Sequence, residues 1–207
     1  MLRRRKLSIM DKKIKNIIFD VGLVLVDFCW DRYCRELGFS EDVISAFDAN
    51  MIQSKYWGRL DEGTMSEEEA IERFKEAMPE LSSEIDRFWA EPERFVEEFS
   101  YATPLIKELQ SKGYHVYLLS NYPLHLYEIH WPKFKFFSII DGYVVSAVEK
   151  LCKPNPAIYK LLRERYDLKP EECLFIDDRQ INVDAAAGTG MSGLLFEGVD
   201  SVKRIIP

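Results

Sequence analysis

The sequence predicts an α/β fold, a doubly wound parallel sheet with a small helical subdomain inserted into it. Several short apolar runs contain no polar alternation, which is typical of parallel strands covered on both faces. Helical patterns separate the later runs, and strands that alternate with helices build a parallel sheet. One long segment near the start lacks a strand signal, and this interruption indicates the insertion.

The strands follow from the positions of these apolar runs. We expect five of them, at residues 17–20, 116–120, 142–146, 173–177 and 193–196. Between the later runs the apolar residues recur at helical spacing, which predicts helices at 104–112, 155–166 and 182–187.

The segment from about 21 to 115 breaks this rhythm, because we find no convincing strand in it. It carries helical signals at 30–37, 41–50, 66–78 and 82–100, and Ser66 with Glu69 matches a capping box. A parallel crossover needs only one helix, so most of this segment is an insertion. We therefore expect a helical cap at 28–100, a core formed by 16–27 and 101–207, and a basic tail at 1–15.

The composition bounds the class of protein. The 207 residues are 47% hydrophobic and 30% charged, which is ordinary for one large globular domain or a domain with an insertion. The net charge of −7 argues against nucleic acid as the main partner. No apolar run approaches the roughly 18 residues of a membrane span, which argues against a membrane partner.

The cysteines and the N-terminus bear on the compartment. The four cysteines are scattered and form no C-x-x-C pair, which favours a reduced, cytoplasmic setting. The basic tail lacks the apolar stretch of a signal peptide, and Met10 offers a second start besides Met1. No sequence signal bears on the oligomeric state.

Polar groups follow the ends of four predicted strands. They are Asp20, Ser120 with Asn121, Lys153 after a short linker, and Asp177 with Asp178. Each alone has an ordinary explanation as a turn former, a helix cap or a solvated residue. Ligands of open parallel sheets bind at the carboxyl ends of the strands, however, so we expect these side chains to converge.

The chemistry of this set is coherent. Three carboxylates at close quarters repel one another unless a cation lies among them, and oxygen ligands with a substrate phosphate suit Mg²⁺. The Lys153 ammonium and the Ser120 hydroxyl would stabilise phosphoryl oxygens. A carboxylate beside them can attack phosphorus and form an aspartyl-phosphate, which divides hydrolysis into two easier steps.

The chain from residue 16 onward resembles the haloacid dehalogenase-like (HAD) hydrolases, whose core is Rossmann-like. The motifs that carry the resemblance are IIFDVGLVLVD, VYLLSN, CKPNPAIY and LFIDDRQINVDAA, in the family's order. KPNPAIY followed by FIDD is typical of the subgroup with a small helical cap inserted after the first motif. The match looks closest to members that act on small phosphorylated metabolites, including α-D-glucose-1-phosphate phosphatases, and it implies a phosphatase whose substrate is a sugar phosphate.

The resemblance also implies roles. Asp20 would be the nucleophile, Ser120 and the Asn121 backbone would hold the transferring phosphoryl group, and Lys153 would neutralise charge on both.

The metal ligands carried over in the same way are Asp20, the Gly22 carbonyl and Asp178, with Asp177 as a ligand or beside one. Asn182 would orient Asp178 or a metal-bound water.

Gly22 departs from the family's pattern, because phosphatases of this family usually carry a second Asp there. That carboxylate protonates the leaving group and then activates water, which is worth roughly 10²- to 10⁴-fold in rate. Three outcomes stay open: the enzyme favours good leaving groups such as an anomeric sugar phosphate, a cap side chain or a water substitutes, or turnover is poor.

Three other functions compete with a phosphatase. True haloacid dehalogenases share the nucleophile, the Ser-Asn and the Lys, but they need no metal and lack the acidic pair formed here by Asp177 and Asp178. Response-regulator receivers carry their acidic pair first in the chain, so the order of motifs excludes them. A catalytically weak or non-catalytic protein that binds a phosphometabolite is the alternative from another class.

The cap is expected to select the substrate, since a lid excludes water and completes a site. Its candidate contacts are Phe28, Trp30, Tyr56, Trp57 and Arg59, although aromatic residues of a small helical bundle usually form its core. The segment WGRLDEGTMS, residues 57–66, is predicted to be a loop that faces the active site.

Overall fold

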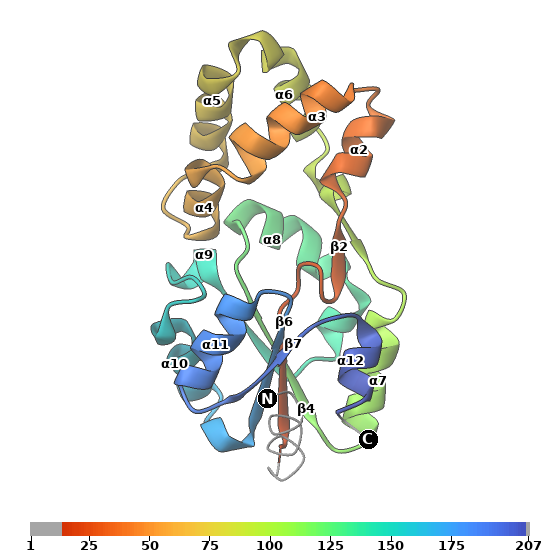
Figure 1. Cartoon of the computed structure of the whole chain (residues 1–207), viewed down its shortest axis with the longest axis vertical. Coiled ribbons are helices and arrows are strands. Elements are labelled where there is room, and N and C mark those ends of the chain that lie inside the picture. Colours follow the sequence, from red (N-terminus) through yellow and green to blue (C-terminus); the bar gives the residue numbers. More distant parts are fainter. Residues whose placement is uncertain (1–13, 206–207) are drawn as a thin grey trace.

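A computed structural model describes residues 14–205, and most of the predicted tail at 1–15 lies outside this range. A sheet of five parallel strands in the order β5-β4-β1-β6-β7 forms the lower part of the molecule in Figure 1. Its strands are β1 (Asn16–Phe19), β4 (His115–Ser120), β5 (Gly142–Val145), β6 (Cys173–Asp177) and β7 (Ser192–Leu195). All five predicted strands, and the doubly wound parallel fold, are confirmed.

The register of the central strand explains how residues distant in the chain meet. β1 pairs with β4 on one side, with Asn16 opposite His115, and with β6 on the other, with Asn16 opposite Cys173. Because these pairs are parallel, the segments that follow Phe19, Ser120 and Asp177 leave the sheet at the same edge.

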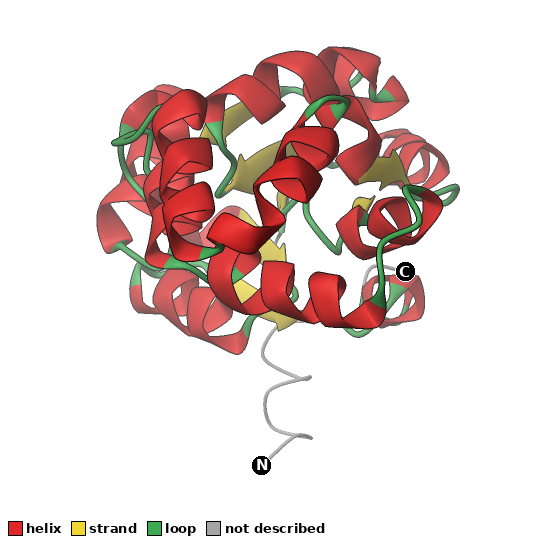
Figure 2. Ribbon diagram, turned by 90° about the horizontal axis from the view of Figure 1, so that it is seen from above, coloured by secondary structure: helices red, strands yellow, loops and turns green. Residues whose placement is uncertain are grey.

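Helices cover both faces of the sheet, and Figure 2 shows them around the strands. Alternate strand residues point to opposite faces, so Ile17 and Phe19 of β1 pack in one apolar cluster and Ile18 in another. The cluster of Ile17 includes side chains of α7 (Ala102–Ser111) and α12 (Val199–Lys203), and that of Ile18 includes α10 (Pro156–Arg165) and α11 (Gln180–Gly188). The shorter α8 (Leu124–His130) and α9 (Ser146–Glu149) follow β4 and β5.

A second group of helices lies above the carboxyl edge of the sheet (Figure 1). It consists of α2 (Trp30–Glu36), α3 (Glu41–Phe47) with a π-helical turn at Asp48–Ile52, α4 (Lys55–Asp61), α5 (Glu67–Ala77) and α6 (Ser82–Trp89). We refer to these five helices as the cap helices. The capping box at the start of α5 is confirmed, since Ser66 and Glu69 each accept a hydrogen bond from the other's backbone N–H.

The prediction that residues 57–66 form a loop is wrong for the first half of that segment. Lys55–Asp61 is helix α4, and the Ser54 side chain accepts a hydrogen bond from Trp57 N at its start. Gly58 disfavours a helix by only about 1 kcal/mol, and the packing of α4 overrides this preference. The loop proper covers residues 62–66.

The prediction of a helix over 82–100, and of no strand between 21 and 115, is also wrong. Helix α6 ends at Trp89, a 3₁₀ turn follows at Pro92–Phe95, and β3 (Val96–Glu98) pairs antiparallel with β2 (Val26–Phe28). Three-residue strands are too short to show a period, and their pairing spans about 70 residues of chain. The ribbon β2-β3 joins the cap helices to the sheet (Figure 1), and the division at 28 and 100 stays a prediction.

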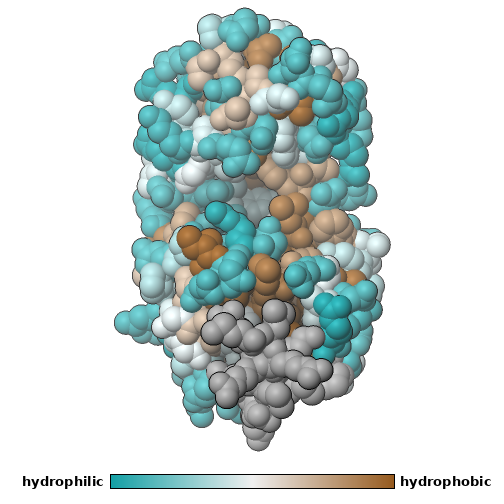
Figure 3. Space-filling model, viewed as in Figure 1, coloured by the Kyte–Doolittle hydropathy of each residue, from teal (hydrophilic) through white to brown (hydrophobic). Residues whose placement is uncertain are grey.

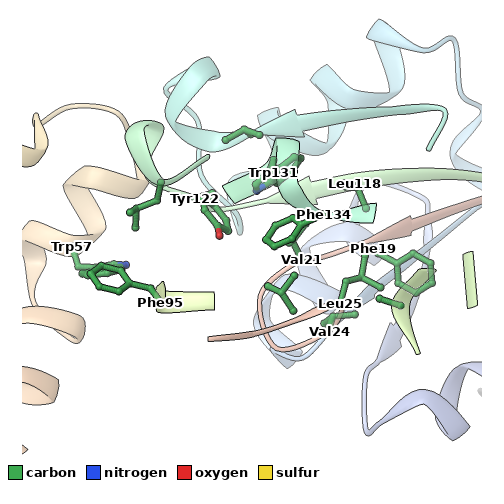
Figure 4. Packing of buried hydrophobic residues seen from close by; sticks show 14 of the residues in the cluster. Phe19, Val21, Val24, Leu25, Trp57, Phe95, Leu118, Tyr122, Trp131 and Phe134 are labelled. Atoms are coloured by element: carbon green, nitrogen blue, oxygen red, sulfur yellow. The ribbon is translucent and has the colours of Figure 1, made fainter. Parts of the chain in front are cut away.

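Sheet and cap share one apolar core. Figure 4 shows it running from Phe19 and Leu118 of the sheet, past Trp131 and Tyr122, to Trp57 and Phe95. Burial of this kind stabilises by roughly 25 cal/mol per Å² of apolar surface, so the shared core holds the cap against the sheet. None of the helices over residues 14–205 combines the length and apolarity required to traverse a bilayer.

Candidate active site

Asp20 follows the central strand and is held in place by its neighbours. Its backbone N–H continues the sheet ladder to Ile176 O at 2.9 Å, and its Oδ1 accepts from Val21 N at 2.7 Å. After Asp20 the chain turns sharply through Gly22 and Leu23, and Leu23 takes a left-handed φ of 58°. The turn leaves the Asp20 carboxylate, 8% exposed, at the mouth of the sheet edge.

Lys153 is a buried cation between two carboxylates. Its Nζ lies 2.8 Å from Asp20 Oδ1 and 2.7 Å from Asp177 Oδ2, and its side chain is 1% exposed. Burial alone would lower the pKa of Lys153, but the charges of Asp20 and Asp177 outweigh it and raise that pKa. Lys153 is therefore a fixed positive charge.

Ser120 and Asn121 follow β4. The Ser120 hydroxyl donates to Asp20 Oδ1 at 3.0 Å. The Asn121 side chain clamps the backbone of Lys153: its Nδ2 donates to Lys153 O at 3.0 Å, and its Oδ1 accepts from Lys153 N at 2.8 Å. The side chain of Asn121 thus positions the lysine, and the predicted contact of its backbone with a phosphoryl group stays a prediction.

The two residues of the acidic pair lie in different surroundings: Asp177 is buried and Asp178 lines the pocket. Asp177 is fully buried and accepts from Lys153 Nζ, from Arg179 N at 2.8 Å and, at both carboxylate oxygens, from Asn182 Nδ2. Asp178 is half-buried and lines the pocket. The amide of Asn182 therefore contacts Asp177, whereas one of its two predicted roles placed it on Asp178.

The donor set fits a divalent cation. Asp20, Asp177 and Asp178 each offer an oxygen, and these oxygens lie within 4.8 Å of one another. Burial, followed by the charge of Asp177, raises the pKa of Asp20 to about 7 in spite of Lys153. The buried Oδ1 of Asn182 has no partner among the described residues, which suits a hydrogen bond from a metal-bound water. Three carboxylates beside one ammonium thus leave negative charge that Mg²⁺ would neutralise.

A pocket of about 240 Å³ opens above these groups, between the sheet edge and the cap helices. Figure 3 shows hydrophobic residues beside the hollow between the upper and lower parts of the molecule. The site residues Asp20, Gly22, Lys153 and Asp178 line its floor. Its walls are largely apolar and include Leu23, Val26, Phe28, Trp57, Val96 and Leu126.

Of the five predicted cap contacts, Phe28 and Trp57 line this pocket, with ring centroids 5.6 Å apart. Trp30 and Tyr56 pack against the core instead, and the Arg59 guanidinium donates to Thr64 O.

Asp61 and Arg179 also line the pocket, and sequence reasoning did not assign them to the site. Asp61 lies in the segment expected to face the active site. Its spacing of one helical turn from Trp57 is the signal that would have placed both on one face.

The pocket wall also contains a buried histidine. His130 Nε2 lies 2.8 Å from the carbonyl oxygen of Pro92, which only accepts, so Nε2 donates there and Nδ1 accepts from Tyr122 OH at 2.8 Å. Burial, assisted by the nearby charge of Lys133, lowers the pKa of His130 from 6.5 to about 4 in spite of the Pro92 carbonyl and Glu93, which raise it. His130 is accordingly neutral near pH 7.

This histidine predicts loss of stability in acid. His130 binds a proton near pH 6.5 in the unfolded chain and only near pH 4 in the folded chain. The contribution of neutral His130 to the free energy of unfolding is therefore complete above pH 6.5 and is lost as the pH falls toward 4. At about 1.4 kcal/mol per pH unit the full loss is about 3 kcal/mol. Urea unfolding at pH 7.5 and pH 5 measures the free energy of unfolding. Its decrease between the two pH values should be smaller in His130→Gln than in His115→Gln, a control variant at an exposed histidine. Equal decreases would contradict the assignment.

Proteins similar to this chain in sequence include a phosphatase and a hydrolase. A sesquiterpene phosphatase of Aspergillus oryzae is 27% identical over 87% of this chain and 88% of its own length. A flavin mononucleotide hydrolase of Arabidopsis thaliana is 28% identical over 93% of this chain and 76% of its own.

A solved structure adds a ligand-bound comparison. A HAD family enzyme of Bacteroides thetaiotaomicron, in complex with magnesium and inorganic phosphate, superposes with a TM-score of 0.67. It shares 26% identity and covers 90% of this chain and 96% of its own. The haloacid dehalogenase-like hydrolase model matches residues 14–190, so this chain belongs to the haloacid dehalogenase-like hydrolases.

Proposed function

We propose that this protein is a Mg²⁺-dependent phosphatase that hydrolyses a small phosphorylated metabolite through an aspartyl-phosphate on Asp20. The observation that carries the proposal is the position of the Asp20 carboxylate. It lies within hydrogen-bonding distance of Lys153 and Ser120, next to two further carboxylates and under an open pocket. Phosphoryl transfer needs a placed nucleophile and positive charge at the equatorial oxygens, and this arrangement offers both.

The bonds at Asp20 suggest which oxygen reacts. Oδ1 accepts from Val21 N, Ser120 Oγ and Lys153 Nζ, and Oδ2 accepts no hydrogen bond within the described residues. Oδ2 is therefore the oxygen available to attack phosphorus. Lys153 would stabilise charge on the transferring group, and Ser120 would redirect its hydroxyl to a phosphoryl oxygen. Mg²⁺, held by Asp20, Asp178 and the Gly22 carbonyl with Asp177 beside them, would supply further positive charge for the phosphoryl oxygens.

The pocket bears on the substrate. Apart from Asp61 and Arg179, its walls offer few partners for hydroxyl groups, and unpaired polar groups are costly to bury. The predicted sugar phosphate stays a prediction, as does the narrower resemblance to α-D-glucose-1-phosphate phosphatases. The walls favour a phosphate ester with an apolar or aromatic organic group. The names of the sesquiterpene phosphatase and the flavin mononucleotide hydrolase agree with this, whereas a D-ribitol-5-phosphate phosphatase of Bacteroides thetaiotaomicron, 27% identical, is named for a sugar alcohol phosphate.

The competing functions fit less well. A metal-independent dehalogenase needs no clustered acidic pair, whereas Asp177 and Asp178 lie here with Asp20 in one oxygen cluster. A non-catalytic binding protein has no need for a nucleophile that Lys153 and Ser120 hold in place. A cytoplasmic location stays a prediction.

Phosphate release from a panel of esters tests the proposal. The panel contains glucose 1-phosphate, glucose 6-phosphate, flavin mononucleotide, farnesyl phosphate and hexyl phosphate. With Mg²⁺ we expect release from at least one, with the apolar and aromatic esters ahead of the sugar phosphates, and removal of Mg²⁺ by EDTA should abolish it. Mg²⁺ binding without release from any ester would instead favour the binding protein.

A further inference from the structure

The proposed phosphatase reaction needs a proton donor. The inference that follows about this donor rests on the proposed function. When Asp20 attacks phosphorus, the leaving oxygen departs as an alkoxide unless an acid protonates it. Later a water must lose a proton to attack the aspartyl-phosphate. Gly22, two residues after the nucleophile, lines the pocket but has no side chain to serve either step.

Most other titratable groups at the pocket are already engaged. The Lys153 ammonium is held by two carboxylates, and Asp178 belongs to the oxygen cluster that fits the metal. Both ring nitrogens of His130 are hydrogen-bonded, one of them to the Tyr122 hydroxyl. The Arg179 guanidinium has N–H donors and no acceptor atom, so it cannot take a proton from water.

Asp61 is the carboxylate left over. It closes helix α4 in the cap, lines the same pocket as Asp20 and Lys153, and is partly buried. Among the described residues, the oxygens that lie within 4.8 Å of one another come from Asp20, Asp177 and Asp178, and Asp61 does not belong to this cluster. Asp61 therefore faces the site from the cap side, where the leaving group would lie, and outside the candidate metal ligands.

The sheet edge fixes the backbone of Asp61. The Ser146 hydroxyl donates to Asp61 O at 2.5 Å and accepts from Tyr122 N at 2.9 Å, so one hydroxyl ties α4 to the segments after β5 and β4. Two residues on, Gly63 has a left-handed φ of 64°, and a β carbon there would collide with the carbonyl oxygen of Ala147. The end of α4 thus packs closely against α9. This contact restricts the backbone that carries the Asp61 side chain more than a free loop would.

We propose that Asp61 is the general acid and base of this phosphatase. In the first step Asp20 Oδ2 bonds to phosphorus, the bond from phosphorus to the organic oxygen breaks, and that oxygen takes the proton of the Asp61 carboxyl. In the second step the Asp61 carboxylate takes a proton from water, the water oxygen bonds to phosphorus and the bond to Asp20 breaks. The sum is ester and water to alcohol and phosphate, with both carboxyl groups restored.

The electrostatic surroundings suit such a role. Burial, followed by the charge of Asp20, raises the pKa of Asp61 to about 7, against the opposing charges of Lys153 and Arg179. An acid–base group works best when its pKa lies near the working pH, because both protonation states are then populated.

The test replaces Asp61 by Asn, which keeps the shape and the backbone hydrogen bond to Ser146. On hexyl phosphate, whose alkoxide is a poor leaving group, we expect kcat to fall roughly 10²- to 10⁴-fold with little change in KM. p-Nitrophenyl phosphate needs no acid, so it should give a burst of one nitrophenol per site, followed by slow turnover. Mass spectrometry should then detect accumulated phosphoenzyme. Glu62→Gln, which removes the adjacent exposed carboxylate, is the matched control and should behave as wild type.

A rescue variant separates chemistry from structure. The space around Gly22 is open, since apart from its two chain neighbours no residue has a heavy atom within 4 Å of the position that a β carbon would take, so Gly22→Asp can be introduced there. In the Asp61→Asn background, Gly22→Asp should raise the rate on hexyl phosphate at least 10-fold, because the new aspartate supplies a carboxylate from the other side of the pocket. In the wild type it should raise the rate on hexyl phosphate more than that on p-nitrophenyl phosphate.

The outcomes distinguish the role of Asp61 from the proposed function. Loss on hexyl phosphate, trapped phosphoenzyme and rescue together support Asp61 as acid and base. An active wild type whose Asp61→Asn variant keeps its rate, or loses equally on both esters without phosphoenzyme, overturns the role of Asp61 alone. A wild type that releases phosphate from none of the esters overturns the proposed function, and the role of Asp61 with it.

Discussion

Asp20→Asn is expected to abolish phosphate release, lowering the rate by roughly 10⁴- to 10⁶-fold, the range found when a catalytic nucleophile is removed. The amide oxygen is a poor nucleophile, and the change also removes one candidate metal ligand. The fold should survive, since Asn has the same shape and Lys153 keeps its bond to Asp177. Phosphate release on the best ester of the panel measures the rate, and thermal unfolding checks the fold.

The covalent step has its own readout. Wild type quenched in acid during turnover should carry the added mass of one phosphoryl group on the peptide that contains Asp20, and Asp20→Asn should carry none. Asp184→Asn is the matched control: Asp184 lies on α11, is exposed and accepts from Gln180 Nε2 at 2.7 Å. Retention of more than about 1% of the rate in Asp20→Asn would mean direct attack by water and would exclude the aspartyl-phosphate.

Lys153→Met should both inactivate the protein and destabilise it strongly. The buried ammonium lies between Asp20 and Asp177, and its removal leaves two buried carboxylates without their cation. Breaking a buried ion pair in this way costs about 3–5 kcal/mol. Urea unfolding measures the loss, and added Mg²⁺ should return part of it because the ion supplies a new positive charge.

Two further variants make this result interpretable. Lys160→Met removes an exposed lysine that pairs with Glu164 on α10, and it should change stability by no more than about 0.5 kcal/mol. The double variant Lys153→Met with Asp20→Asn should be more stable than Lys153→Met alone, since it removes one of the two uncompensated charges. A loss below about 1 kcal/mol in Lys153→Met would show that the lysine is not the main counter-charge of this cluster.

The elements of the sheet were predictable because their signals are local. The apolar runs that become β1, β4, β5, β6 and β7 are continuous, and each polar group that ends a run stands directly after it in the sequence. Since parallel strands end at one edge, the convergence of Asp20, Ser120 and Asp177 followed from order along the chain alone. The residue types then indicated a cation and a phosphoryl group.

The elements that escaped prediction depend on long-range contacts. β2 and β3 are three residues each and exist because Val26–Phe28 and Val96–Glu98 pair across the whole cap. Helix α4 contains a glycine, and its packing in the shared core outweighs that local preference. The local sequence preference of a segment carries no information about the distant strand or side chains that it will contact.

The sequence alone was enough to predict the hydrolase family, because Asp20 and the acidic pair stand at the ends of strands that the apolar pattern reveals. Lys153 follows the strand β5 after the short helix α9. The identity of the cap carboxylate that lines the same pocket depends on long-range contacts of the folded chain. Asp61 reaches the pocket through the hydrogen bond from Ser146 to its backbone and the close approach of Gly63 to Ala147. Those contacts join segments 85 residues apart, and no local pattern records a contact that forms only when the chain folds.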